Sequence, residues 1–178
     1  MNLKKVIMIG ISFIFLFSFI THNLYDWFPS TITSIFFPVN ESIWEHQKMI
    51  FTTVILWGIV EYYLLKRYNI KFKNIAAAIT VSAISNIVIF LIIYIPFHIT
   101  IGHNLIITLL LYLISIVISQ IINYYILTFK YNLKEVNAIS IIVIPFIFFI
   151  FGLLTYFPLE WELLFYDEYS NKHGIYDY

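Results

Sequence analysis

The chain has 178 residues, of which 61% are hydrophobic and 20% aromatic, and only 11% are charged. Soluble domains carry about 25% charged residues, so this chain lacks the polar surface needed to cover a water-soluble globule. Ten Lys and Arg residues balance ten Asp and Glu residues without a basic stripe, which argues against nucleic acid as a partner. The lack of cysteine excludes disulfide scaffolds and thiolate chemistry. An integral membrane protein remains, with the lipid bilayer as its first partner.

Five segments are apolar enough to cross the hydrocarbon core, which takes about 20 residues of helix. They cover residues 6–25, 44–65, 75–97, 105–127 and 138–157. The second is the weakest because Glu45, His46, Lys48 and Glu61 lie near its ends, where we expect them to face the interface or protein. The sequence therefore predicts an all-α fold, a polytopic membrane helix bundle of five transmembrane helices. Residues 1–178 would form a single integral membrane domain with an outer tail over residues 158–178.

Basic residues set the expected orientation. Eight of the ten lie before the first span, in the loop of residues 66–73, or near residue 130. Because basic residues favour the cytoplasmic side, we expect a multi-pass protein of the cell membrane with its N-terminus inside and its C-terminus outside. All five histidines and eight of the ten carboxylates then fall on the outer side, so an active site would open to the extracytoplasmic face.

Between the first two spans, apolar residues recur at helical spacing from Asp26 to Pro38. This pattern predicts a short interfacial helix that Pro38 ends. The helix would either hold the two spans apart or act as a gate over a site.

The densest polar run in the chain, residues 38–48, reads PVNESIWEHQK. Two helix starts fit it: Asn40 as N-cap, or Ser42 as N-cap with Glu45 closing a capping box. Neither explains His46, which stands beside two carboxylates. Lys48 could neutralise Glu41 and Glu45, as could a metal ion or a substrate cation.

Further candidates lie at the ends of other spans. His22 and Asp26 are one helical turn apart, a spacing at which a carboxylate can orient a ligating or catalytic imidazole. His98 and His103 lie in an outer turn, where we expect Pro96 and Gly102 to break the helices and Asn104 to cap the next helix.

The run Pro-Val-Asn-Glu-Ser-x-Trp-Glu-His-x-Lys over residues 38–48 resembles the signature of an uncharacterised family of short bacterial multi-pass membrane proteins. The resemblance extends over nearly the whole chain, and its departures from the family pattern are Thr108, Glu168 and His173. It implies a membrane location and supplies no reaction. Further matching positions are His22, Tyr25, Asp26, Gly102, His103, Ser119, Gln120, Tyr124, Tyr125, Pro158, Leu164, Phe165, Asp167, Gly174 and Ile175.

A weaker likeness concerns chemistry. Membrane hydrolases of the alkaline ceramidase and adiponectin-receptor group hold zinc with Ser-x-x-x-His on one helix, and Ser42 and His46 have this spacing. This chain has five expected spans where that group has seven, and His98 and His103 do not reproduce its paired histidines, so the likeness is an analogy.

These observations predict an extracytoplasmic-facing enzyme, a metal- or acid/base-dependent hydrolase or transferase acting on a lipid or lipid-linked substrate. Catalytic candidates are Glu45, His46 and Glu41, with one of the carboxylates as the base that activates water. Candidate metal ligands are His22, His46 and His103, a set that suits a divalent metal such as zinc. Candidate substrate-binding residues are Asn40, Lys48 and Asp26, with Lys48 holding an anionic group.

The alternative is a non-enzymatic accessory or ligand-binding subunit, including a transporter component. The NESxWEH motif would then be a structural polar clasp in which Glu41, Glu45, His46 and Lys48 satisfy one another.

Overall fold

The computed structural model of the chain describes residues 1–175. Its five long helices are α1 (Leu3–Trp27), α3 (Ile43–Arg67), α4 (Ile75–Ile101), α5 (Leu105–Leu127) and α6 (Lys134–Tyr156). All five are long and apolar enough to cross a membrane, which confirms the predicted all-α polytopic bundle. The smaller elements are α2 (Thr31–Phe36), α7 (Glu162–Phe165) and a two-residue antiparallel hairpin of β1 (Tyr166–Asp167) and β2 (Lys172–His173).

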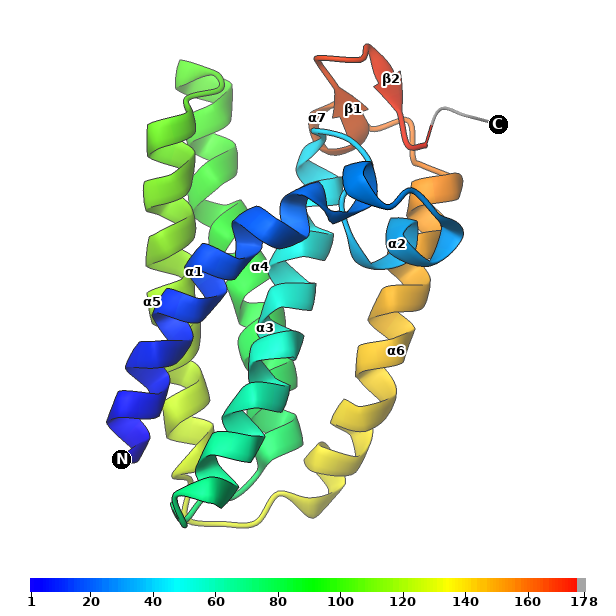
Figure 1. Cartoon of the computed structure of the whole chain (residues 1–178). Helices are drawn as coiled ribbons and strands as arrows, with labels where there is room; N and C mark the ends of the chain where they lie inside the picture. The colour runs from blue at the N-terminus through cyan, green and yellow to red at the C-terminus, as the bar shows by residue number, and fades with distance from the viewer. Residues whose placement is uncertain (176–178) are drawn as a thin grey trace.

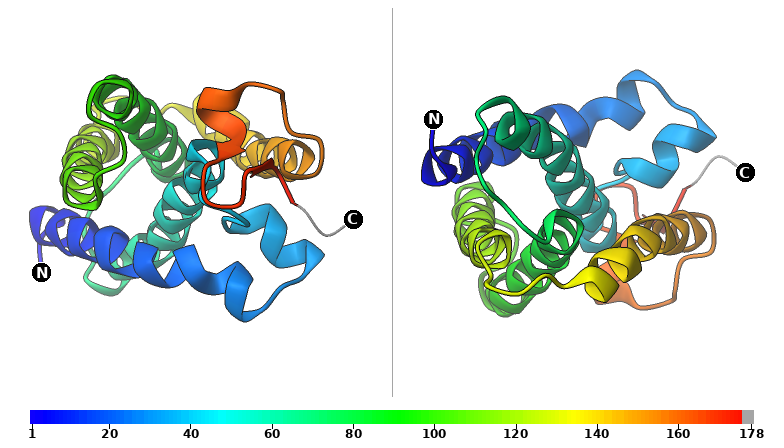
Figure 2. Two further views of the ribbon diagram at one scale, coloured as in Figure 1. Left: turned by 90° about the horizontal axis from the view of Figure 1, so that it is seen from above. Right: turned by 90° about the horizontal axis from the view of Figure 1, so that it is seen from below.

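Helix α3 lies in the middle of the bundle (Figures 1 and 2). It packs against α1 and α4, while α4 and α5 form an antiparallel hairpin that also contacts α1. Helix α6 packs against α4 and α2 on the other side. This central position explains the polar ends of α3, the most buried of the five helices: Glu61, for example, is fully buried and accepts hydrogen bonds from the Asn123 amide at 2.9 and 3.0 Å.

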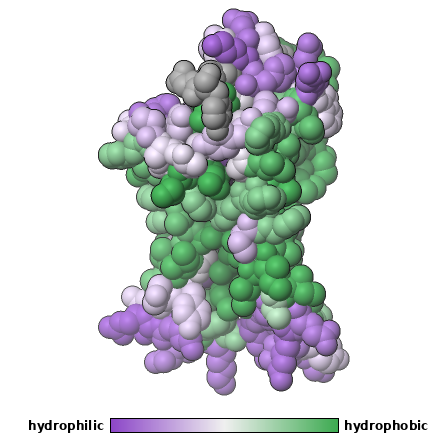
Figure 3. Space-filling model, turned by 90° about the vertical axis from the view of Figure 1, so that its right-hand side faces the viewer, coloured by the Kyte–Doolittle hydropathy of each residue, from purple (hydrophilic) through white to green (hydrophobic). Residues whose placement is uncertain are grey.

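The two ends of the bundle differ in character. One end, here called the hairpin end, carries α2, α7 and the β-hairpin (Figure 1). The opposite end carries the loops after α3 and α5, with basic residues at Lys66, Arg67, Lys71, Lys73 and Lys130. An apolar band separates the two hydrophilic ends (Figure 3), as expected for a chain whose middle lies in hydrocarbon.

The helices extend beyond several of the expected spans. Helix α4 continues through Pro96 to Ile101, so the prediction that Pro96 breaks it was wrong. Proline is tolerated within membrane helices because hydroxyl side chains and neighbouring helices can satisfy the freed backbone groups. Here the Thr100 hydroxyl donates to the Pro96 carbonyl at 2.8 Å. Gly102 does end α4, and Asn104 caps α5 by accepting from the Ile107 amide, as predicted.

The tail folds back over the hairpin end. Phe165 stacks on Trp44 with ring centroids 5.0 Å apart, and the Ile175 amide donates to the Thr155 carbonyl at 3.1 Å. The Asn40 amide donates to the Gly174 carbonyl at 2.8 Å. The tail is thereby joined to α3, α6 and the loop before α3. Residues 176–178 of the expected tail lie outside the described residues.

Close packing of α1 on α3 gives a first prediction. A Cβ at Gly10 would lie 2.6 Å from Cε2 and Nε1 of Trp57, which is 1% exposed. We expect Gly10→Ala to lower the free energy of unfolding in detergent by about 1–3 kcal/mol, because overpacking displaces the buried indole. The matched control is Met8→Ala, at an exposed position of the same helix, where a change within about 0.5 kcal/mol is expected. Equal unfolding curves for the two variants would contradict this packing argument.

Candidate metal centre

The polar run at residues 38–48 is only partly helical. Helix α3 begins at Ile43, and Ser42 is its N-cap, with the hydroxyl accepting from the Glu45 amide at 3.3 Å. The Asn40 side chain accepts from the Ser42 amide at 2.9 Å and so shapes the turn before the cap. Glu41 precedes the helix, so its side chain does not share a helical face with Glu45. Glu41 lies beside His22, whereas Glu45 contacts Thr155.

Glu41 lies beside two imidazoles. The Nε2 atoms of His22 and His46 are 3.2 Å apart. The Glu41 carboxylate oxygens lie 3.6 Å from His22 Nε2 and 3.5 Å from His46 Nε2. All three ligand atoms lie within 4.8 Å of one another. The end of α1, the loop before α3 and the first turn of α3 therefore meet at one point.

The backbone fixes the orientation of His46. Its Nδ1 lies 2.8 Å from the carbonyl oxygen of Ser42, the N-cap residue one turn earlier. A carbonyl only accepts hydrogen bonds, so Nδ1 carries the proton in this contact and Nε2 presents its lone pair to His22 and Glu41. This is the arrangement in which a histidine is held ready to bind a metal.

The spacing of the two imidazole nitrogens suits a tetrahedral metal ion. Ligands at the zinc–nitrogen bond length of about 2.0–2.1 Å stand near 3.3 Å apart at the corners of a tetrahedron. The two imidazole nitrogens, 3.2 Å apart, match that value, and each has an oxygen of the Glu41 carboxylate near it, Oε1 at 3.6 Å from His22 Nε2 and Oε2 at 3.5 Å from His46 Nε2. Two imidazole nitrogens and one carboxylate oxygen are also ligands that zinc commonly takes, and a set of three leaves one position open.

The electrostatics of the cluster favour an ionised carboxylate. The contact with the His22 imidazole holds the pKa of the Glu41 carboxyl below its ordinary value, against the opposing effect of partial burial, and the neighbouring His46 acts in the same direction. Glu41 therefore remains a negatively charged ligand to lower pH than an isolated glutamate would.

A cavity of about 750 Å³ opens beside the cluster. Its walls come from α1, α3, α4 and α5 and are mostly apolar, including Phe19, Ile50, Phe90 and Leu109. His22, Glu41 and His46 line one part of the wall, so a ligand in this cavity would meet them directly. The cavity is within the range of about 300–1,000 Å³ in which small molecules bind.

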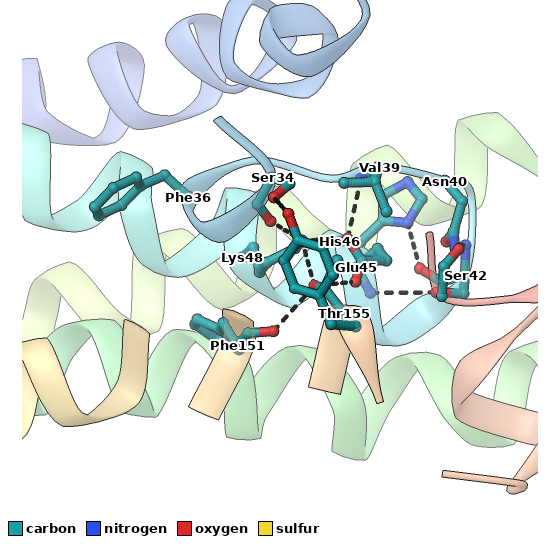
Figure 4. Close-up of polar contacts among 12 residues, drawn as sticks. Ser34, Phe36, Val39, Asn40, Ser42, Glu45, His46, Lys48, Phe151 and Thr155 are labelled. Atoms are coloured by element: carbon teal, nitrogen blue, oxygen red, sulfur yellow. Dashed lines mark hydrogen bonds and ion pairs between the residues drawn. The ribbon is translucent and has the colours of Figure 1, made fainter. Parts of the chain in front are cut away.

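Glu45 and Lys48 belong to a separate cluster (Figure 4). Their side chains form a fully buried ion pair, in which Lys48 also donates to the Ser34 carbonyl at 2.7 Å and to the Thr155 hydroxyl at 2.8 Å. Glu45 accepts from the Thr155 hydroxyl at 2.8 Å and from the Val39 amide at 3.0 Å. We call Glu45, Lys48, Thr155 and Ser34 the buried clasp; it joins α2, α3 and α6.

The structure therefore divides the sequence candidates. It brings together His22, Glu41 and His46. Glu45 and Lys48 form an ion pair with each other and do not line the cavity. His103 lines the cavity but stands outside the group of three ligand atoms. Asn40 is engaged with the tail and the helix cap, and Asp26 is exposed at the end of α1.

Two residues of the region were missed from sequence. Thr155 completes the buried clasp, and its signal was a single threonine in the aliphatic and aromatic stretch FIFFIFGLLTYF. Tyr169, in the turn of the β-hairpin, lines the cavity and lies 6.4 Å from the His103 ring, centroid to centroid. A tyrosine in an aromatic tail carries no comparable signal.

Comparison with curated proteins and with solved structures finds no match. The model of a family of unknown function (DUF6512) matches residues 1–175, almost the entire chain. This agrees with the resemblance to an uncharacterised family noted from the sequence. The chain belongs to this family of unknown function, DUF6512.

Proposed function

We propose that the chain is a membrane enzyme that depends on a divalent metal and acts as a hydrolase or transferase on a lipid or lipid-linked substrate. The metal, zinc by preference, would be held by His22, Glu41 and His46. The observation that carries this proposal is the meeting of two imidazole nitrogens, 3.2 Å apart, with the Glu41 carboxylate on the wall of a large, mostly apolar cavity.

The chemistry of the wall supports this reading. Zinc with three protein ligands supplies a Lewis acid that can activate water or polarise a carbonyl oxygen. A group that moves protons is needed beside it, and Glu45 is engaged in the buried clasp. His103 lines the same cavity and is the side chain that we assign to this task.

The distribution of charge supports an outward-facing site. The cluster lies at the hairpin end, and the basic loops lie at the opposite end of the bundle. Because basic loops favour the cytoplasm, the cavity would open on the extracytoplasmic side of the cell membrane.

The metal content of the protein tests the proposal. We expect detergent-purified wild-type protein, prepared without chelators, to carry about one divalent ion per chain by elemental mass spectrometry. His46→Ala removes one of three ligands and the oriented imidazole, so the ion should be lost from that variant. His22→Ala and Glu41→Gln should lower the metal content as well.

His98→Ala is the matched control. His98 lies in the last turn of α4, where its Nδ1 is 3.3 Å from the Tyr94 hydroxyl, and it is not one of the three clustered ligands. This variant should keep the full metal content. A metal-free wild-type protein would contradict the proposal and favour the alternative, a non-enzymatic accessory or ligand-binding subunit, including a transporter component.

A further inference from the structure

The cavity beside the metal centre has a polar neighbour. A second cavity, of about 460 Å³, lies between the hairpin end of α4 and the tail. Glu41, His103 and Tyr169 line both cavities. A single ligand could therefore occupy the two cavities at once and pass the metal centre at their junction.

The first cavity fits an aliphatic chain. Along α5 it extends from Leu105 to Tyr112, a rise of about 10 Å at the helical rise per residue. Phe19 on α1 and Leu105 on α5 are 46% and 62% exposed, so the wall reaches the lipid-facing surface of the bundle. A chain could enter there from the bilayer without crossing water.

The second cavity fits a positively charged head. Three carboxylates line it; Glu41 is assigned to the metal, so Glu162 and Glu168 are left to meet the head, and none of the described residues in its wall is Lys or Arg. Tyr94, Tyr166 and Tyr169 line it too, and aromatic faces beside carboxylates are a favourable setting for an ammonium group. Lys48, the lysine nearest to Glu41 along the sequence, is buried in its ion pair with Glu45.

We propose that the ligand of this site is an amphiphile whose aliphatic chain lies in the apolar cavity and whose head is a cationic amine in the polar cavity. The bond on which the enzyme acts would lie between them, next to Glu41. This inference rests on the proposed function for the reaction, but the binding preference can be measured without turnover. It replaces the expectation from the sequence that Lys48 holds an anionic group.

The test compares three ether lipids with the same hexadecyl chain. Their heads are choline, glycerol and phosphoglycerol, which are cationic, neutral and anionic. Affinities are measured by native mass spectrometry of the purified protein in an uncharged detergent. We expect the choline ether to bind at least about tenfold more tightly than the phosphoglycerol ether, because like charges in the polar cavity repel the anionic head.

Two pairs of variants locate the two halves of the ligand. Reversing charge in Glu162→Lys/Glu168→Lys should abolish the preference for the cationic head, while Glu160→Lys, outside the cavity wall, should retain it. Leu109→Trp should fill the apolar cavity and weaken all three lipids about tenfold. Leu110→Trp, at the next residue and 55% exposed, is its control and should bind as wild type does.

Equal or tighter binding of the anionic lipid would overturn the inference, as would unchanged binding by Leu109→Trp. These outcomes are separate from those of the metal test. A protein that carries the metal but shows no head preference would retain the proposed function and lose this inference. A metal-free protein that prefers the cationic lipid would retain this inference and contradict the proposed function.

Discussion

Lys48→Met is expected to be the most destabilising of the substitutions considered for this chain. It would leave the Glu45 carboxylate, 1% exposed, without its counter-ion, and it would remove the donor to the Ser34 carbonyl. Removing one partner of a buried pair costs about 3–5 kcal/mol, because the remaining charge is uncompensated. The free energy of unfolding, followed by circular dichroism in detergent, should fall by this amount.

A double variant separates the lost charge pairing from lost packing. Glu45→Gln/Lys48→Met removes both charges at similar volume, so we expect it to recover much of the stability lost in Lys48→Met. Lys66→Met, at an exposed position of the same helix, is the control and should change stability by no more than about 0.5 kcal/mol. If Lys48→Met unfolds like Lys66→Met, the buried clasp does not stabilise the bundle.

The two clusters explain why one short motif fitted two different functions. Glu45 and Lys48 face α6 and the loop after α2, where their hydrogen bonds hold helices together. Glu41 and His46 face α1 and the cavity, where they meet His22. The motif thus contains both the structural clasp and the candidate metal ligands, on different sides of the start of α3.

Much of this arrangement follows from local patterns in the sequence. Length and hydropathy predicted the five membrane helices, and the positions of residues relative to these spans predicted that the histidines and most carboxylates gather at one end and most basic residues at the other. Local rules also offered Ser42 as the start of α3. They could not choose between Ser42 and Asn40, and this choice decides whether Glu41 shares a helical face with Glu45.

The contacts between distant segments could not be predicted. His22 and His46 are 24 residues apart, and their meeting depends on how α1 crosses α3. Thr155 reaches Glu45 across 110 residues through the packing of α6. Side-chain periodicity describes which face of a helix is buried, but it carries no information about which neighbour covers that face.

His103 gives the second large expected effect, on turnover. It lies in the loop between α4 and α5, lines both cavities, and stands outside the group of candidate metal ligands. If the chain hydrolyses palmitoylcholine, as the two proposals together imply, and His103 moves a proton at the junction, His103→Asn should lower kcat for release of palmitate by about 10²–10⁴-fold. The metal content should not change, because His22, Glu41 and His46 remain.

Chemical rescue distinguishes proton transfer from a merely structural role. Asparagine cannot take up or release a proton, so added imidazole should restore part of the kcat lost in His103→Asn if the side chain transfers a proton in wild type. His98→Asn, at a position that lines the polar cavity but not the apolar one, should gain no activity from added imidazole. Full activity in His103→Asn would remove His103 from the reaction, whereas loss of metal from this variant would instead make it a ligand. Because the binding, metal and rescue measurements respond to different residues, each outcome assigns a role to one side of the cavity.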